Sequence, residues 1–376
     1  MLRTSTHFQT DCHFCALPVI IPPLKHLQTA YCPRCQARLS RFHRHSLDYS
    51  IAFAVAAVFF LLASIPFDFL SFRVQGQQEN LHLAGTVTRM VDENYLILAL
   101  IQLVTILLIP VLVLGAMLYL LLPIRMGKPA LPGASIVYLL QYRLIPWCMV
   151  EVFLIGALVS IFKMSSMADI GLGRSFYAFG LFSFCLLACF YFLDQQQLRM
   201  AIGIRNFHAG GHKLSSQHTW ALLITAVLFY IPASTYPIMT SRVFGKDVPS
   251  TIMEGVFQLW AHGSYPIAII IFVASVIIPI AKIILIAWLT FTVQRKMDWR
   301  PDFRMQLYRL IEFIGRWSMI DVFVVVLLAS LIDLGSLLSV YPGPAILAFC
   351  TVVILTMLAA ITFDSHLIWN PHKHDE

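Results

Sequence analysis

Four cysteines near the N-terminus have the spacing of a metal site. They lie in "CHFC" (residues 12–15) and "CPRC" (residues 32–35), which together give the pattern C-x2-C-x16-C-x2-C. Two thiolate pairs on tight turns close a tetrahedral zinc site with no open position for catalysis. The alternatives are an iron site, thiols without metal, or two disulfides, which a cytoplasmic location disfavours. We expect one structural zinc ion, held by Cys12, Cys15, Cys32 and Cys35, to fold a ribbon that is too short to form a core by itself.

A second set of chemically active residues consists of ionisable groups inside apolar runs. "WCMVEVF" (147–153) contains Glu151, "WSMIDVF" (317–323) contains Asp321 in the same frame, and Lys282 lies in the apolar run 265–291. Such groups cost several kcal/mol in a bilayer unless they are paired, hydrated or protonated, so they mark functional sites by default. The other interpretation is that the acids hold helices together or lie at the level of the lipid headgroups.

The positions of these groups predict a polar network. Lys282 and Asp321 lie at depths that differ by only about 7 Å at 1.5 Å per residue, a distance that a lysine side chain can cover. We expect them to face each other across two neighbouring helices, with Ser318 completing the network by hydrogen bonding. The position that corresponds to Lys282 in the first half of the chain is Val113. Glu151 is therefore expected to lack a basic partner and to exchange protons near neutrality.

The elements that must position these residues are membrane helices. Hydrophobic residues make up 59% of the 376 residues and charged residues only 12%, against roughly half and a quarter in soluble domains. A bilayer core about 30 Å thick needs about 20 apolar residues per helix, and the apolar runs are continuous rather than alternating as in a barrel. We predict an all-α polytopic membrane protein with eight transmembrane helices, at residues 49–70, 94–122, 143–165, 176–194, 219–238, 265–291, 317–337 and 343–363.

The basic residues predict the orientation of these helices. The segments on the side of the two termini, with Arg143 at a span edge, contain 19 of the 26 Lys and Arg residues, whereas the loops on the other side contain five. The positive-inside rule then places both termini in the cytoplasm. The net charge of +7 is thus a signal of topology and of contact with anionic lipid headgroups, not of nucleic-acid binding. Residues 1–48 lack the apolar segment of a signal peptide.

The chain contains an internal repeat at an offset of 169–170 residues. Aligned residues of unusual type include Arg73 with Arg242, Gly76 with Gly245, Pro110 with Pro279, Trp147 with Trp317, and Asp194 with Asp364. Because each half has an even number of spans, the halves should be parallel repeats related by an axis along the membrane normal. We divide the chain into a zinc ribbon (1–48), a first four-helix repeat (49–198), a cytoplasmic linker (199–218) and a second four-helix repeat with a short tail (219–376).

Two further features concern the ends of the bundle. The loops 71–93 and 239–263 face the far side, and the stretch "STIMEGVFQLWAHGS" (250–264) should form a short hairpin or a re-entrant cap. Trp147 and Trp317 are expected to be interfacial anchors beside the acids. Outside the ribbon, Cys148, Cys185, Cys189 and Cys350 are expected to pack as small apolar residues.

The four-cysteine ribbon and the series "STIMEGVFQLW", "IIPIAKI", "WSMIDVF" and "TFD" resemble the paraquat-inducible protein A family. They are also similar to the inner-membrane lipid-transport subunit that partners a periplasmic tunnel protein with MCE (mammalian-cell-entry) domains in Gram-negative bacteria. Many members of the family carry a second cysteine ribbon between the halves. Here the linker 195–218 contains no cysteine. Its three histidines, His208, His212 and His218, are expected to be ordinary loop residues.

Two functions follow from these observations. The resemblance implies transport of phospholipid or a similar amphiphile to or from the MCE-domain partner in the cell envelope, with proton movement at the acids as the simplest energy source. The alternative is a non-transporting scaffold that anchors the envelope partner while the ribbon binds a cytoplasmic protein. The sequence contains no GxxxxGK[ST] nucleotide motif, redox chemistry lacks a flavin, haem or iron–sulfur signature, and no set of catalytic residues can be assembled, so we do not expect an enzyme.

Overall fold

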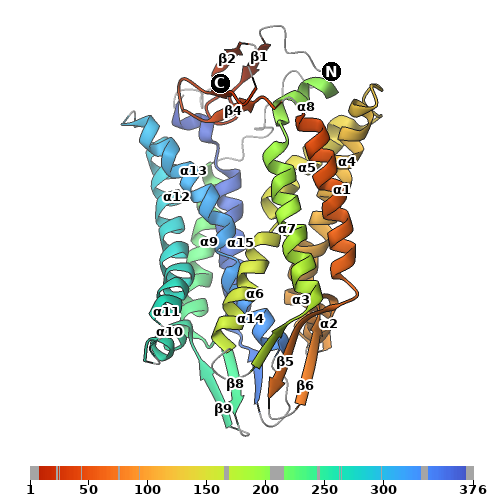
Figure 1. Ribbon diagram of the computed structural model, residues 1–376. Coiled ribbons are helices and arrows are strands. Elements are labelled where there is room, and N and C mark those ends of the chain that lie inside the picture. Colours follow the sequence, from red (N-terminus) through yellow and green to blue (C-terminus); the bar gives the residue numbers. More distant parts are fainter. Residues whose placement is uncertain are drawn as a thin grey trace.

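The computed structural model describes residues 8–369 except 23, 25, 44, 75–76, 93, 165–168, 204–215, 244–245, 262, 264, 298 and 332–337. The described part is a bundle of long helices with a small ribbon of strands at one end and two sheets at the opposite end (Figure 1). The last described residue, Trp369, lies beside the ribbon, where its carbonyl accepts a hydrogen bond from Arg34. The residues Gly76, Gly245, His208 and His212 lie outside the described part, and His218 is exposed.

The ribbon consists of two antiparallel hairpins, each closed by one of the cysteine pairs. Strand β1 (Phe8–Asp11) pairs with β2 (Pro18–Ile21), and β3 (Thr29–Tyr31) pairs with β4 (Arg38–Arg41). These strands lead directly into the first long helix of the bundle. The ribbon is therefore tied to the bundle by a very short connection.

The helices of the first part of the chain are interrupted at two places. They are α1 (Ser46–Ser64), α3 (Leu96–Leu103) continuing through the π-helical turn η1 (Val104–Leu108) into α4 (Ile109–Arg125), α5 (Ala134–Leu144) continuing through the 3-10 turn η2 (Ile145–Trp147) to α6 (Val150–Met164), and α7 (Arg174–Phe192). A short helix, α8 (Gln195–Ile202), follows α7 on the ribbon side.

The same kinds of element follow in the same order in the second part. They are α9 (Ser216–Thr235), α11 (Tyr265–Phe272) with the π-helical turn η3 (Val273–Ile277) and α12 (Ile278–Gln294), α13 (Pro301–Trp317) and α14 (Ile320–Leu331), α15 (Ala345–Thr362), and the 3-10 turn η4 (Ser365–Ile368). Among the described residues, seven helical stretches are long and apolar enough to cross a membrane. The predicted span 317–337 contains the 12-residue helix α14, and its residues 332–337 lie outside the described part.

The all-α prediction is wrong at the end opposite the ribbon. Strands β5 (Asp68–Val74), β6 (Gln77–His82) and β7 (Asp169–Leu172) form one antiparallel sheet, and β8 (Met239–Val243), β9 (Lys246–Ser250) and β10 (Leu338–Pro342) form another. The stretch 250–264 does not form the hairpin that was one of its two expected structures, because Ile252–Ala261 form the helix α10, which follows β9 as the helix α2 (Leu83–Asp92) follows β6. The outer strands β7 and β10 come from segments about 100 residues away, which no local pattern reveals.

Two of the predicted spans belong to longer helical stretches that begin much earlier in the sequence. The span predicted at 143–165 is part of a stretch that begins at Ala134, and α14 is preceded directly by α13 from Pro301. The charged residues of α13 made this segment resemble a cytoplasmic loop, but its buried residues Arg304, Met305, Tyr308, Ile311 and Gly315 recur with a helical period along one face. Each of these two stretches is interrupted near its middle, at 145–149 and at 318–319.

The acids that were predicted near the membrane surface lie just after these interruptions. Glu151 is the second residue of α6, and Asp321 is the second residue of α14. Trp147 lies within the first interruption and Trp317 is the last residue before the second, and both side chains are partly buried. Each acid therefore lies in the middle of its helical stretch, inside the bundle, and not at the end of the stretch.

Helices α6 and α14 pack closely against each other. A Cβ atom added at Gly156 would lie 3.1 Å from the Cβ of Phe323 and 3.6 Å from the carbonyl oxygen of Ile320. One turn further along, the Ser160 hydroxyl donates to the carbonyl oxygen of Val324 over 3.3 Å. The two helices thus approach at the distance that a glycine permits.

The substitution Gly156→Ala should destabilise the bundle. The added methyl group would push α14 away from α6, and overpacking of this kind costs about 1–3 kcal/mol. The control is Gly180→Ala on α7, where no atom lies within 4 Å of the added Cβ and where alanine stabilises a helix by roughly 0.5–1 kcal/mol over glycine. The melting temperatures of both variants in the same detergent check this prediction, and equal values would contradict it.

Candidate functional site

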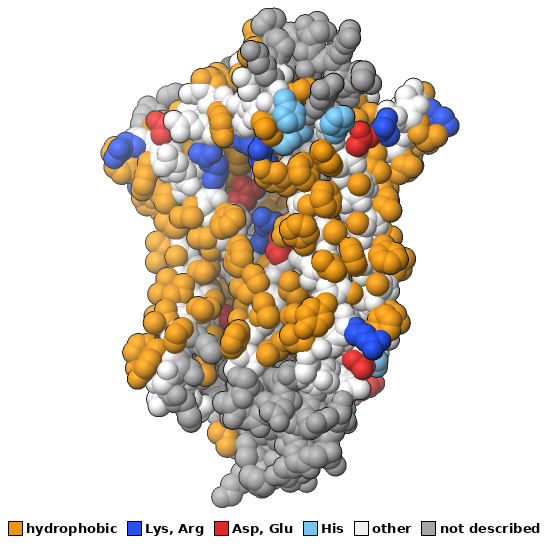
Figure 2. Space-filling view, viewed as in Figure 1, with side chains coloured by type: hydrophobic (Ala, Val, Ile, Leu, Met, Phe, Trp, Pro, Cys, Tyr) orange, Lys and Arg blue, Asp and Glu red, His pale blue; other side chains and the backbone are white. Residues whose placement is uncertain are grey.

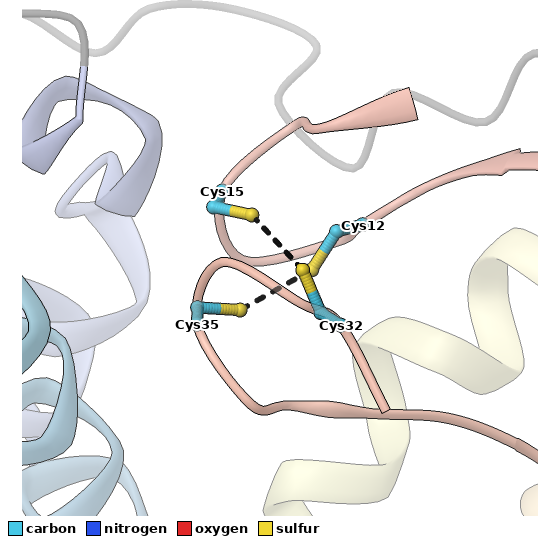
Figure 3. Close-up of side chains that lie close together, drawn as sticks. All are labelled: Cys12, Cys15, Cys32 and Cys35. Atoms are coloured by element: carbon cyan, nitrogen blue, oxygen red, sulfur yellow. Dashed lines mark hydrogen bonds between the residues drawn. The ribbon is translucent and has the colours of Figure 1, made fainter. Parts of the chain in front are cut away.

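The four cysteines of the ribbon come together as the spacing predicts. Their sulfur atoms all lie within 4.8 Å of one another and all four residues are buried. The Cys12 and Cys35 Sγ atoms are 3.5 Å apart, and those of Cys15 and Cys32 are 3.6 Å apart (Figure 3). Zinc–sulfur bonds of about 2.3 Å in a tetrahedron place sulfur atoms about 3.8 Å apart, whereas a disulfide needs about 2.05 Å. All four are free thiols, and their arrangement fits a metal ion.

The two cysteine turns have the same backbone geometry. The Ala16 amide donates to the Cys12 carbonyl over 2.8 Å, and the Gln36 amide donates to the Cys32 carbonyl over 2.9 Å. Ala16 and Gln36 both have a positive φ, 53° and 56°, which turns the chain away from the sulfurs after each second cysteine. The repetition of this conformation at two non-glycine residues fits two equivalent halves of one metal site.

The thiols influence one another strongly. Hydrogen bonds from Cys15 and Cys35 lower the pKa of Cys12, with help from the backbone amides of Phe14 and Cys15. Hydrogen bonds with Cys12 and Cys35, together with burial, raise the pKa of Cys15. One thiolate is therefore favoured in the absence of metal, but four thiolates at this separation need a cation to be ionised together. A divalent metal ion would supply that charge and displace the remaining protons.

The ribbon contacts the first part of the bundle through β4. The Ser40 hydroxyl donates to Asp194 Oδ2 over 2.6 Å. The Arg41 guanidinium donates to the Tyr191 hydroxyl and lies 4.9 Å from the centre of the Tyr191 ring. Both partners lie at the end of α7 or directly after it, so these contacts fix the ribbon to that helix.

The ribbon also contacts the second part of the bundle, through its cysteine turns. The Arg309 guanidinium on α13 donates to the Cys35 carbonyl over 3.0 Å, and the Ser365 hydroxyl donates to the Phe14 carbonyl over 3.0 Å. On the second turn, Arg34 donates to the Trp369 carbonyl over 3.2 Å and stacks on its ring. The metal site is therefore built into a small domain that bridges both parts of the bundle.

Glu151 has a basic partner, contrary to the prediction. The Arg316 Nη1 atom lies 3.5 Å from Glu151 Oε1. The partner was missed because it does not occupy the position that corresponds to Lys282. It lies at the end of α13, five residues before Asp321, in a segment that was assigned to a cytoplasmic loop. This ion pair joins the two interrupted helical stretches, although its two residues are 165 positions apart in the sequence.

The predicted network of Lys282, Asp321 and Ser318 does not form in this structure. All three residues are buried, with exposures of 2%, 7% and 1%. The Lys282 Nζ atom and the Ser318 hydroxyl have no hydrogen-bond partner among the described residues. Lys282 therefore does not pair with Asp321, because the earlier start of α13 places Asp321 farther from the ribbon side than the sequence suggested.

Asp321 instead lines a small cavity beside the π-helical turn η3. The cavity has a volume of about 40 Å³ and is also lined by Ser275 of η3 and by Thr251 and Gly255 at the start of α10. That volume exceeds the roughly 15 Å³ that a water molecule requires. Lys282 lies seven residues beyond Ser275, or about two helical turns. Lys282 and Asp321 consequently lie at different depths along the bundle.

The π-helical turns η1 and η3 lie at matching places. Each is followed by a proline, Pro110 or Pro279, which has no N–H to donate to the preceding turn. Each contains a buried hydroxyl: Thr105 donates to the Ile101 carbonyl and Ser275 donates to the Ile271 carbonyl. Turns of this kind often mark functional places in helices, and the aligned prolines were the visible signal in the sequence.

The described fold defines a multi-pass membrane protein that carries a four-cysteine metal-binding ribbon on one end of its helical bundle. Residues 47–202 and 216–373 match the paraquat-inducible protein A family, and the chain belongs to this family. The family resemblance inferred from the sequence is thereby confirmed.

Three relatives indicate the range of similarity within the family. The chain is 34% identical over 409 residues to the intermembrane transport protein PqiA of Escherichia coli (strain K12), which covers 97% of this chain and 96% of that protein. It is 28% identical to the lipophilic envelope-spanning tunnel protein A of the same organism, over 96% of this chain and 91% of that protein. A probable intermembrane transport protein of Haemophilus influenzae is 36% identical over 44% of this chain and 39% of its own length. No solved structure matches the chain.

Proposed function

We propose that this chain is the inner-membrane component of a system that moves phospholipid, or a similar amphiphile, between the membrane and the rest of the cell envelope. Its relatives are named for intermembrane transport and for an envelope-spanning tunnel. The partner would be a periplasmic MCE-domain protein, which would accept or deliver the lipid at the end of the bundle that carries the two sheets. In this proposal the ribbon and both termini lie in the cytoplasm, which the distribution of the basic residues supports.

We further propose that the two parts of the bundle are duplicated halves, related by an axis along the membrane normal. The recurrence of interrupted helices, π-helical turns and three-stranded sheets in the same order supports this. In membrane transporters, sites at the interface of such halves are often built from discontinuous helices. The interruptions beside Glu151 and Asp321 are at equivalent positions of the two halves and meet near the contact of α6 with α14.

One observation carries the transport proposal: charged side chains are retained at the interruptions, inside a band of apolar surface. The side chains of Glu151 and Arg316 are 20% and 33% exposed, so they are reachable from outside. Acidic and basic side chains are visible midway along the apolar side of the molecule, where the surface is hollowed (Figure 2). Such a place suits a lipid headgroup that moves between the halves while its acyl chains remain in the bilayer.

The roles of the remaining groups follow from their surroundings. Asp321 faces a cavity that can hold water, so we assign proton movement to this acid, which would bias the bundle between two conformations. Lys282 is buried on α12, and it would bind an anionic group that enters when the halves move apart. Zinc in the ribbon would act structurally, by holding the domain that bridges the halves.

The substitutions Asp321→Asn and Lys282→Met test transport. We expect each to reduce delivery of a fluorescent phospholipid from proteoliposomes to the periplasmic partner by about tenfold, because a hydrogen bond to a charged group contributes roughly 1.5–3 kcal/mol. Asp302→Asn, at an exposed acid in the first turn of α13, is the matched control and should transport normally. Normal delivery by both Asp321→Asn and Lys282→Met would remove these groups from the mechanism.

A scaffold function is the second candidate, and the ribbon favours it. Ile20, Leu27 and Tyr31 are exposed on the ribbon by 65%, 55% and 61%, as a surface for a cytoplasmic protein would be. A scaffold needs neither Asp321 nor Lys282. Cells that carry the variants would then keep the detergent resistance of the parent strain, provided that the proteins insert at the same level.

A further inference from the structure

A groove of about 610 Å³ lies where α4 ends and the chain turns toward α5. One side of the groove is the last two turns of α4, and the other side is the loop from Lys128 to Pro132. Helix α4 ends an apolar stretch of 30 residues, which spans about 45 Å at 1.5 Å per residue. That length matches a bilayer with its headgroup regions, so the groove lies at the level of the headgroups and the adjoining acyl chains.

The loop that forms the outer side of the groove is held in one position. The Tyr119 hydroxyl on α4 donates to the Pro132 carbonyl over 2.8 Å, and the Lys128 amide donates to the Pro123 carbonyl over 2.9 Å. The loop also contains two prolines, whose φ angles are fixed by their rings. The groove is therefore formed before any ligand binds, which lowers the cost of binding.

The side chains that line the groove are almost all apolar. Leu122, Met126 and Leu131 are 44%, 62% and 41% exposed there. The volume lies within the roughly 300–1,000 Å³ of pockets that hold small molecules, and methionine adapts its shape to flexible apolar ligands. This lining suits a hydrocarbon chain.

Lys128 is the one charged residue in the lining of the groove. It is exposed, and its ammonium group makes no ion pair or side-chain hydrogen bond with the described residues. The nearby Arg125 is instead paired with Asp48. A cation without a partner at headgroup level attracts an anionic lipid.

The corresponding place in the second part of the bundle is occupied by a side chain. The ends of α4 and α12 are 169 residues apart, so Tyr119 corresponds to Trp288. The connection from α12 to α13 has six residues, against eight from α4 to α5. It contains Trp299, whose ring meets the Trp288 ring edge to face, with the centroids 6.3 Å apart. The longer connection in the first part therefore leaves open a place that an indole takes in the second.

We propose that this groove binds an anionic phospholipid of the adjacent leaflet. One acyl chain lies in the groove along Leu122 and Leu131, and the phosphate group accepts a charge-assisted hydrogen bond from the Lys128 ammonium. A membrane lipid is the occupant because the groove lies at the end of a membrane-spanning stretch and combines an apolar lining with one cation. The bound lipid would join the end of α4 to the start of α5.

The test uses the full-length, metal-loaded protein in nanodiscs that contain a phospholipid with a photoactivatable diazirine in its acyl chain. Phosphatidylglycerol and phosphatidylcholine with the same chains are compared, and the labelled peptides are identified by mass spectrometry. Lys128→Gln removes the cation and keeps the lining. Ala130→Trp, at an exposed position of the loop, fills the groove with an indole as Trp299 does in the second part.

The matched controls are Lys296→Gln, at an exposed lysine directly after α12, and Ala130→Ser, which leaves the groove open. We expect residues 118–132 of the parent to be labelled about fivefold more by phosphatidylglycerol than by phosphatidylcholine, the effect of one lysine near anionic lipid. Lys128→Gln should abolish this preference. Ala130→Trp should reduce the labelling by about tenfold or more, because several methylene groups lose their contacts. Both controls should be labelled like the parent.

Equal labelling of residues 118–132 by the two lipids in the parent, or unchanged labelling of Ala130→Trp, would overturn the proposal. A dimer of the parent in native mass spectrometry that becomes a monomer in Ala130→Trp would assign the groove to a second copy of the chain, and would also overturn it. The proposal does not rest on lipid movement through the bundle, so the Asp321→Asn protein should be labelled as the parent is. A protein that is labelled normally but transports nothing would refute the proposed function alone.

Discussion

Replacing Cys12 with serine in the full-length protein should reduce its bound zinc from one ion per chain to none. A structural site needs all four thiolates, because three ligands and a hydroxyl leave the charge and the tetrahedron incomplete. Binding of zinc contributes about 10–16 kcal/mol to the folding of such small domains, and the ribbon has few other buried groups. Metal analysis of the purified protein measures the change and also distinguishes zinc from iron.

Loss of the metal should release the ribbon from the bundle. The contacts of Arg34, Arg309 and Ser365 depend on the positions of the cysteine turns, so limited proteolysis should cut within residues 8–43 while the membrane helices remain intact. Cys185→Ser is the control, because this cysteine is buried on α7, away from the site. If Cys12→Ser retained as much metal as the parent, the four-cysteine cluster would not be the metal site.

The ribbon could be predicted from the sequence because its chemistry is local. Two CxxC turns 16 residues apart fix both the ligands and the hairpins that present them, and the structure brings all four sulfurs together. The contacts of the ribbon with both parts of the bundle could not be predicted. Ser40 and Asp194 are 154 residues apart, and Cys35 and Arg309 are 274 residues apart.

The interrupted helical stretch that begins with α13 could not be predicted from hydropathy. Residues 301–317 contain four arginine or glutamate side chains at Arg304, Arg309, Glu312 and Arg316, which lowers the mean hydropathy below that of a membrane helix. In the structure Arg304 is buried and donates to the Ile368 carbonyl over 3.0 Å. Charges that are satisfied by protein instead of water do not mark the end of a helix. Because the starts of these helical stretches were predicted too late in the sequence, Glu151 and Asp321 were predicted too close to the membrane surface. The predicted pairing of Lys282 with Asp321 depended on that depth.

Removing the charge of Glu151 should destabilise the bundle and reduce lipid transport. Glu151→Gln leaves Arg316 without its carboxylate in an apolar band, and Arg316→Gln does the same to Glu151. Breaking a fully buried pair costs roughly 3–5 kcal/mol. We expect about 1–3 kcal/mol here, because the side chains are partly exposed and separated by 3.5 Å. Melting temperatures and lipid delivery from proteoliposomes measure the two effects.

The double variant Glu151→Gln/Arg316→Gln separates bracing from transport. It leaves no unpaired charge, so stability should return to a value near that of the parent. If the pair only braces the two helices, transport returns as well. If the charges contact the headgroup, transport stays low although the protein is stable, and this is the result that we expect. Arg242 and Asp247 form an exposed pair on the hairpin β8–β9, and the same double replacement there should change neither quantity. Full transport by the stable Glu151→Gln/Arg316→Gln protein would show that the lipid does not use these charges.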